Sequence, residues 1–121
     1  MVSSFSVEYK KDYLAMIVEG TYDYWDFMQY PQLILKACKE YQCNKMLVDL
    51  TPIKAEEIAL IELFFLGEKI AKVLGTKVML ALIWKSESLS DFLVDVATNR
   101  SARLKVFDNK KRAEYWLLHK Y

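Results

Sequence analysis

Few side chains that could do chemistry occur in this sequence, and their placement limits what they can do. His119 is the only histidine. A Ser-His-Asp or Cys-His arrangement needs its base on an ordered scaffold, and a terminal helix that frays is a poor one. We therefore interpret His119 as a cation that stabilises the C-terminus of a helix.

The two cysteines, Cys38 and Cys43, lie five positions apart. This spacing suits neither a CxxC redox pair nor half of a zinc site, and it favours two reduced thiols in a cytoplasmic protein. With one histidine they cannot furnish a tetrahedral zinc site, so we expect no metal. The three glycines stand at 20, 67 and 75, too far apart for a phosphate-binding loop, and we expect no cofactor.

Asp49 is the carboxylate with the most unusual sequence context, because it lies inside an apolar strand pattern. An unpaired charge there would be costly. Asp49 is therefore either a general base or a carboxylate that is hydrogen-bonded at a strand end, and we favour the second. Asn99 and Arg100 could partner Asp49 or an anionic ligand; the alternative is that they cap the C-terminus of a helix.

Hydrophobic periodicity predicts the elements that must position these residues. Strands are predicted over 5–9, 13–19, 46–50, 78–84 and 104–107. Helices are predicted over 23–41, 55–74, 91–101 and 110–118. Strands that alternate with helices favour an α/β fold, here one domain over residues 1–121 with a mostly parallel sheet. Pro31 lacks a backbone donor, so the first helix should be kinked or split there.

Ligands of open α/β sheets bind beyond the carboxyl ends of the strands. In this sequence that edge should bring together Tyr22, Thr51, Trp84, Lys85 and Ser86. These side chains offer hydroxyls, a cation and an aromatic wall, which suit a small anionic or amphipathic ligand. They include no base and no nucleophile, so binding is favoured over a reaction.

Several short motifs occur in an order that is typical of one family. They are Leu47-Val48-Asp49-Leu50, Asn99-Arg100, Leu104-Lys105-Val106-Phe107-Asp108 and Ala113-Glu114-Tyr115-Trp116-Leu117. Together they resemble the SpoIIAA-like (STAS/SEC14-like) domain family. The resemblance implies a right-handed βα superhelix with four helices and a five-stranded mixed sheet of order 1-2-3-4-5, strand 1 being antiparallel.

The same family includes anti-sigma-factor antagonists and transporter-associated regulatory domains, so the resemblance implies a regulatory role. In the antagonists a phosphorylatable serine follows the third strand, within a motif like Asp-Ser-Ser-Gly. Here the corresponding residues are Asp49-Leu50-Thr51-Pro52, in which Thr51 is the only hydroxyl and no glycine follows. We therefore do not expect a phosphorylation switch. Ser101 stands where typical members have glycine.

The helical pattern at 55–74 has more large apolar side chains than one core-facing stripe can hold. At about 100° per residue, a stripe around Leu63 and Ile70 faces the sheet, and Gly67 allows close approach to it. The apolar side chains on or beside the opposite side are Ile58, Ile61, Phe64 and Phe65. The outer side of such a helix is ordinarily polar. An apolar patch there usually marks association, so we predict a symmetric homodimer or another protein partner.

Both faces of the predicted sheet are apolar. Leu80, Leu82 and Trp84 alternate with Met79, Ala81 and Ile83, and Ile17, Leu47 and Phe107 extend the second face. A superhelix that winds one way places its helices on the first face. The second face must then be covered by another protomer, by the first helix or by a ligand.

Composition narrows the classes of function. Apolar residues make up 54% of the chain and charged residues 27%, which excludes intrinsic disorder. No apolar run approaches the ~20 residues of a transmembrane segment, and no signal peptide is visible. Residues 100–121 carry seven basic and two acidic side chains, but in no motif that reads nucleic acid, so nucleic acid is not an expected partner.

The first hypothesis is accordingly a non-catalytic protein-interaction or regulatory module that associates with itself. The alternative is a carrier or sensor of a small apolar or amphipathic ligand, as SEC14-like relatives would imply, with its pocket between the sheet and the second and third helices. An enzyme is the hypothesis that we favour least.

Overall fold

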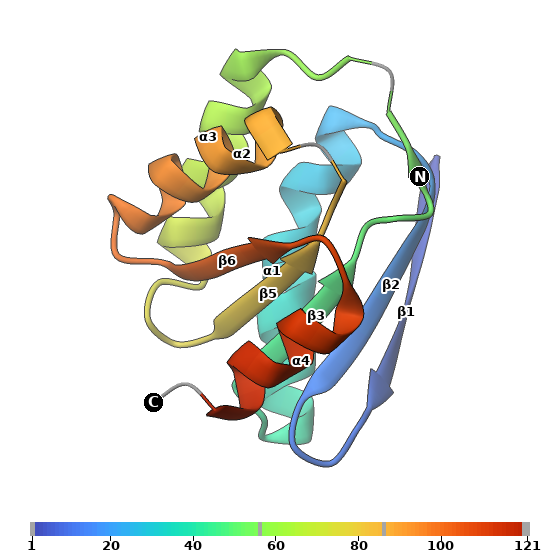
Figure 1. Cartoon of the computed structure of the whole chain (residues 1–121), viewed down its shortest axis with the longest axis vertical. Helices are drawn as coiled ribbons and strands as arrows, with labels where there is room; N and C mark the ends of the chain where they lie inside the picture. Colours follow the sequence, from blue (N-terminus) through green and yellow to red (C-terminus); the bar gives the residue numbers. More distant parts are fainter. Residues whose placement is uncertain (1, 56, 86, 120–121) are drawn as a thin grey trace.

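The computed structural model describes residues 2–55, 57–85 and 87–119. Its elements in chain order are β1 (Ser3–Tyr9), β2 (Leu14–Thr21), α1 (Tyr24–Tyr41), β3 (Lys45–Asp49), β4 (Ile53–Lys54), α2 (Leu60–Val73), β5 (Met79–Ile83), α3 (Glu87–Thr98), β6 (Arg103–Phe107) and α4 (Lys110–His119). Figure 1 shows the strands side by side in one twisted sheet, with helices on both of its faces.

The sheet has the predicted order. Its strands follow one another as β1-β2-β3-β5-β6, with β1 antiparallel to β2 and each later neighbour parallel. The five predicted strands are thus confirmed, and β4 is an addition. This two-residue strand pairs in parallel with the end of β2, at Gly20 and Thr21.

Local signals in the sequence place the first elements. Lys10 N donates to Tyr13 O across the hairpin turn, where Lys11 has a φ of 79°. Asp23 is the N-cap of α1, and its side chain accepts a hydrogen bond from the backbone N of Asp26, as its spacing predicts. The helix continues past Pro31 without a break, so the predicted split does not occur.

The second helix begins five residues later than the periodicity predicts. Residues 53–54 form β4, and Ala59, the N-cap of α2, has an extended backbone with φ −64° and ψ 137°. Pairing with β2 therefore holds the chain extended directly before the predicted start of the helix at residue 55. Gly67 does allow a close approach, but to α3 and not to the sheet: a Cβ at this position would lie 2.8 Å from Val96 Cγ1.

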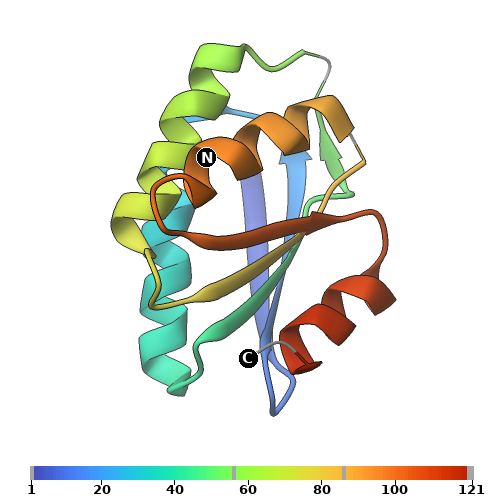
Figure 2. The ribbon, with the colours of Figure 1, turned by 60° about the vertical axis from the view of Figure 1, so that its left-hand side comes forward.

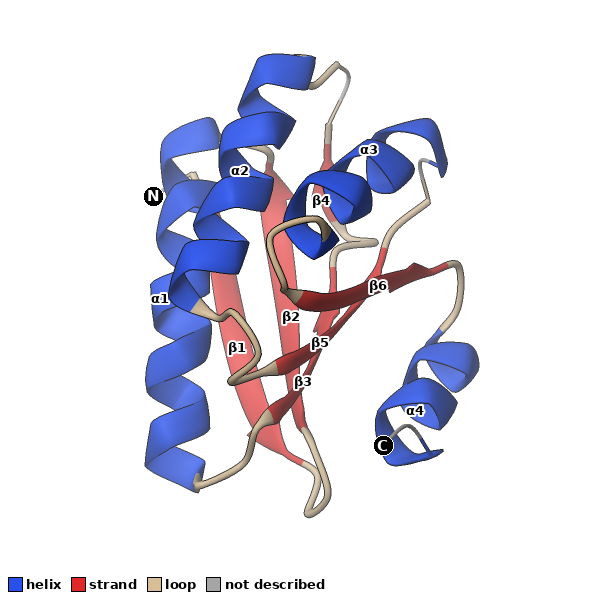
Figure 3. Ribbon diagram, turned by 90° about the vertical axis from the view of Figure 1, so that its left-hand side faces the viewer, coloured by secondary structure: helices blue, strands red, loops and turns tan. Residues whose placement is uncertain are grey.

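Two clusters of buried side chains lie on opposite faces of the sheet. The larger joins one strand face to α1, α2 and α3, and includes Leu14, Val48 and Leu80. The smaller joins the other face to α4, and includes Met79 and Leu117. Figures 2 and 3 show α4 on the side of the sheet away from α1 and α2.

The helix on the second face was not predicted. We expected another protomer, α1 or a ligand to cover Met79, Ala81 and Ile83, whereas α4 covers them. Ala113 and Leu117, one turn apart on α4, are fully buried against this face. The outer face of β1 needs no cover because its side chains there are Ser4, Ser6 and Glu8, all exposed. Ile17, on the same face of β2, remains in the open, with 41% of its surface exposed.

Candidate functional site

At the carboxyl end of β3, Asp49 folds back on the residues that follow it. Its Oδ1 accepts hydrogen bonds from Thr51 N at 2.9 Å and from Thr51 Oγ1 at 2.7 Å. These two bonds satisfy a half-buried carboxylate at a strand end, which is the role that we favoured from the sequence. They also occupy the Thr51 hydroxyl.

Tyr22 lies at the same edge, but both its hydroxyl and its ring contact other residues of this chain. Its hydroxyl donates to Glu62 Oε1 at 2.9 Å, and its ring packs edge-on against Phe27 at 4.8 Å between centroids. Burial, and then the hydrogen bond and negative charge of Glu62, raise the pKa of Tyr22. The residue therefore ties the β2–α1 connection to α2.

Trp84 and Lys85 follow β5 and lie together at the carboxyl edge. Trp84 N donates to Phe107 O at 3.0 Å, which extends the pairing between β5 and β6 by one residue. Both side chains line a groove beside α4. Ser86, which was predicted beside them, lies outside the described residues. The predicted ligand-binding set is thus divided into Asp49 with Thr51, Tyr22 with Glu62, and Trp84 with Lys85.

Asn99 and Arg100 do not join any of these groups. They follow α3 and precede β6, so they lie at the amino edge of the sheet, opposite the carboxyl edge where Asp49 is found. Arg100 Nε lies 3.5 Å from Glu68 Oε2, and its Nη1 donates to Val96 O at 3.2 Å. The predicted partnership of this pair with Asp49 is therefore wrong, and the alternative of a helix C-terminal cap fits Arg100.

The outer side of α2 carries an apolar surface, which we call the α2 patch: Leu60, Ile61, Phe64 and Phe65. Leu60 and Ile61 expose 57% and 58% of their surface and Phe65 exposes 42%. Phe64 is half-buried, with the Arg100 guanidinium 5.2 Å above its ring centroid. The predicted outward position of Ile58 is wrong, because this residue precedes the helix and is only 6% exposed.

The residues that could carry out catalysis are dispersed. Burial raises the pKa of the Cys38 thiol to about 11, which disfavours the reactive thiolate. The ring of His119 lies against Tyr115, with 4.3 Å between centroids. In the part of the chain that the structure describes, no three His, Cys, Asp or Glu residues are arranged to hold a metal. No described helix has both the length and the apolar character needed to cross a membrane.

One buried polar cluster escaped the sequence reasoning. Asp26 is 5% exposed, and its Oδ2 accepts hydrogen bonds from Val2 N, Ser3 N and Ser3 Oγ at 2.9–3.0 Å. Burial alone would raise the pKa of Asp26, but the hydrogen bonds from Ser3 and Val2 hold it below its ordinary value. The Tyr30 hydroxyl contacts Ser3 Oγ as well. This cluster anchors β1 to α1, and its only sequence signal is the acid three residues after Asp23.

Comparison with known proteins identifies the fold. No protein-family model matches the sequence, and no curated protein matches it either. An anti-sigma factor antagonist from Mycobacterium paratuberculosis superimposes with a TM-score of 0.61 over 96% of this chain and 94% of that one, at 14% identity. A protein of the DUF3478 family from Shewanella loihica, described as uncharacterised and with a SpoIIAA-like fold, superimposes with a TM-score of 0.58. The match covers 95% of this chain and 93% of that one, at 22% identity.

The anti-sigma factor antagonist SpoIIAA in its unphosphorylated form gives a TM-score of 0.55 over 98% of this chain and 99% of that one, at 10% identity. These similarities extend over nearly the whole of each chain. The chain therefore has the SpoIIAA-like α/β fold that its motifs imply.

Proposed function

We propose that this chain is a non-catalytic regulatory module that acts by binding protein, and that the α2 patch joins two copies of it. The observation that carries the proposal is the exposure of Leu60, Ile61 and Phe65 on one helix. Large apolar side chains grouped on a surface favour burial in an interface, at roughly 25 cal/mol for each Å² removed from water.

The charges around the patch support a second copy as the partner. Glu57 and Glu62 lie toward the N-terminal end of α2, and Lys69 and Lys72 toward its C-terminal end. If the twofold axis is perpendicular to α2, the two α2 helices run antiparallel, and the acidic end of each meets the basic end of the other. Such a surface is complementary to itself.

Two further observations support a regulatory role without catalysis. Solved structures with this fold include anti-sigma factor antagonists, which are regulators that act on other proteins. The candidate catalytic side chains of this chain are dispersed or hydrogen-bonded in structural roles. Both cysteines are free thiols, in keeping with the predicted cytoplasmic location.

The alternative of a ligand carrier receives less support. The cavity between the sheet and the helices, lined among others by Leu66, Leu82 and Trp84, has a volume of about 40 Å³. Pockets for small molecules measure roughly 300–1,000 Å³. An acyl chain could enter only if α1 or α2 moved away from the sheet.

The test is the mass of the particle in solution, measured by light scattering after size exclusion. We expect a dimer for the wild type and a monomer for Phe65→Asp, because a buried unpaired carboxylate opposes association. Leu118→Asp is the matched control: Leu118 is 40% exposed, against 42% for Phe65, but lies on α4 at the other face of the sheet. A monomeric wild type at every soluble concentration, or equal dissociation by both variants, would contradict self-association.

A further inference from the structure

A groove of about 840 Å³ lies beside α4, at the carboxyl ends of the last two strands of the sheet. Trp84 and Lys85 reach it from the end of β5, residues 105–107 from β6, and Lys111 and Tyr115 from α4. Its volume is within the roughly 300–1,000 Å³ of sites for small molecules. Its place is also where open α/β sheets bind ligands.

Aromatic rings form much of the wall of this groove. Phe107 and Trp116 pack together with 5.8 Å between centroids at 50°, which joins the end of β6 to α4. Tyr115 and Trp84 also line the groove, and Tyr115 is 67% exposed. Flat apolar surfaces held at fixed angles favour a ligand that has a planar ring of its own.

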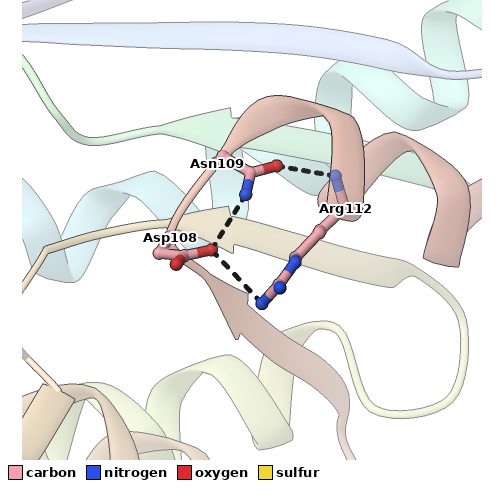
Figure 4. A network of polar contacts seen from close by, with 3 residues as sticks. All are labelled: Asp108, Asn109 and Arg112. Atoms are coloured by element: carbon pink, nitrogen blue, oxygen red, sulfur yellow. Dashed lines mark hydrogen bonds and ion pairs between the residues drawn. The ribbon is translucent and has the colours of Figure 1, made fainter.

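Cationic side chains surround these rings. Lys85, Lys105, Lys111 and Arg112 line the groove, whereas its acidic lining residues are Asp91 and Asp108. Arg112 is already paired: its Nη1 lies 3.8 Å from Asp108 Oδ1. Figure 4 shows this contact together with Asn109, whose side chain donates to Asp108 and accepts from Arg112 N.

The lysines on β6 and α4, Lys105 and Lys111, have no such partner in the described part of the chain. Among the residues that the structure describes, neither Lys105 nor Lys111 forms an ion pair within 4.0 Å. Lys105 Nζ instead lies 5.7 Å from the centroid of the Phe107 ring. A positive charge without a counter-ion beside an aromatic face can bind an anion while the ring packs against the apolar part of the same ligand.

We propose that this groove binds a small anion with a planar aromatic body, such as an aryl phosphate. The rings of Phe107, Tyr115 and Trp116 contact the body of the ligand, and Lys105 and Lys111 neutralise its charge. The groove is lined by residues of α3, α4 and the ends of β5 and β6, and by none of the α2 patch, so a ligand can bind here without displacing the proposed dimer partner. This inference goes beyond the proposed function: a ligand bound in the groove would give the proposed protein-binding module a second, chemical signal.

Isothermal titration calorimetry with 1-naphthyl phosphate tests the site. We expect 1-naphthyl phosphate to bind at least about tenfold more tightly than 1-naphthol, which lacks the charge, and than inorganic phosphate, which lacks the ring. Absence of heat from 1-naphthyl phosphate would overturn the proposal. A second result would also overturn it: the protein sediments with vesicles that contain phosphatidylserine but does not bind 1-naphthyl phosphate. The basic surface would then bind a membrane and not a small aromatic anion.

Paired variants of α4 locate the binding. Lys111→Glu reverses a charge that lines the groove, and we expect it to weaken binding about fivefold. Lys110→Glu makes the same change one residue earlier, outside the groove, and should alter the affinity by less than about twofold. Tyr115→Ala should also weaken the binding of 1-naphthyl phosphate. Tyr115 is exposed, so this substitution should leave the fold intact. Equal losses for Lys110→Glu and Lys111→Glu would mean diffuse attraction and would refute the site.

Discussion

Three helices pack on one face of the sheet, whereas α4 alone packs on the other. The larger core brings together side chains from α1, α2, α3 and the strands, so the loss of one contact affects many neighbours. The smaller core depends on Ala113 and Leu117 for its buried contacts from α4. The comparison teaches that an apolar strand face can be protected by one short helix, and it raises the question of whether the two cores unfold together.

The largest effect should follow from a truncation in the larger core. Leu80, 2% exposed, lies on β5 between β3 and β6 and borders the 40 Å³ cavity. Leu80→Ala should lower the free energy of unfolding by about 3–5 kcal/mol, because the enlarged cavity cannot collapse between paired strands. Urea denaturation measures this change. Leu118→Ala, at an exposed position, should stay within about 0.5 kcal/mol.

A truncation in the smaller core should have a smaller and more local effect. Leu117 is completely buried, and Leu117→Ala should cost about 2–4 kcal/mol. Amide hydrogen exchange should show that α4 loses protection while β3 and β5 keep most of theirs. Uniform loss of protection across the chain would mean that the two cores form one cooperative unit.

A third variant compares the cores with the polar anchor of β1. Asp26→Asn removes the charge that binds Val2 N and Ser3, and should lower the free energy of unfolding at neutral pH. The pKa of Asp26 is below its ordinary value of 3.8 in the folded chain, so its stabilisation is present above that pH. This stabilisation is lost as the pH falls through the folded pKa. The urea midpoints of the wild type and the variant should therefore converge as the pH falls. If the difference between the two midpoints were the same at every pH, the ionised carboxylate would not be the origin of the stabilisation.

The smallest effect concerns the turn between α3 and β6. Ser101 has a φ of 74°, in the left-handed region that glycine tolerates best. Ser101→Gly should therefore raise the melting temperature, with a gain of about 0.5 kcal/mol. Ser6→Gly, in the extended strand β1, is the matched control and should lower it. A destabilised Ser101→Gly protein would show that the serine side chain stabilises the turn.

Elements with a local signal could be predicted from the sequence. Asp23 and its spacing to Asp26 placed the start of α1, and Gly75, with φ +50°, follows the end of α2 as expected of a C-terminal glycine. The extended segment before α2 could not be predicted, because its strand β4 forms only by pairing with Gly20 and Thr21, more than thirty residues earlier. Periodicity within 55–74 contains no information about that contact.

The site was predicted less well, for a topological reason. Trp84 and Lys85 were assigned to the carboxyl edge because they directly follow a strand. Arg100 was considered as a partner of Asp49, with a helix C-terminal cap as the alternative, although a helix that follows a parallel strand returns the chain to the amino edge, where Arg100 lies. The α4 wall of the groove was missed because the stripe of Ala113 and Leu117 predicts a buried side of the helix without naming the sheet face that buries it.

All described strands precede α4 in the chain, and α4 covers the sheet face that carries Met79, Ala81 and Ile83. During synthesis the larger core can therefore assemble while Met79, Ala81 and Ile83 are still bare on the reverse of the sheet. A nascent chain halted before Lys110 would offer these side chains to chaperones. Formation of α4 would then cover these side chains.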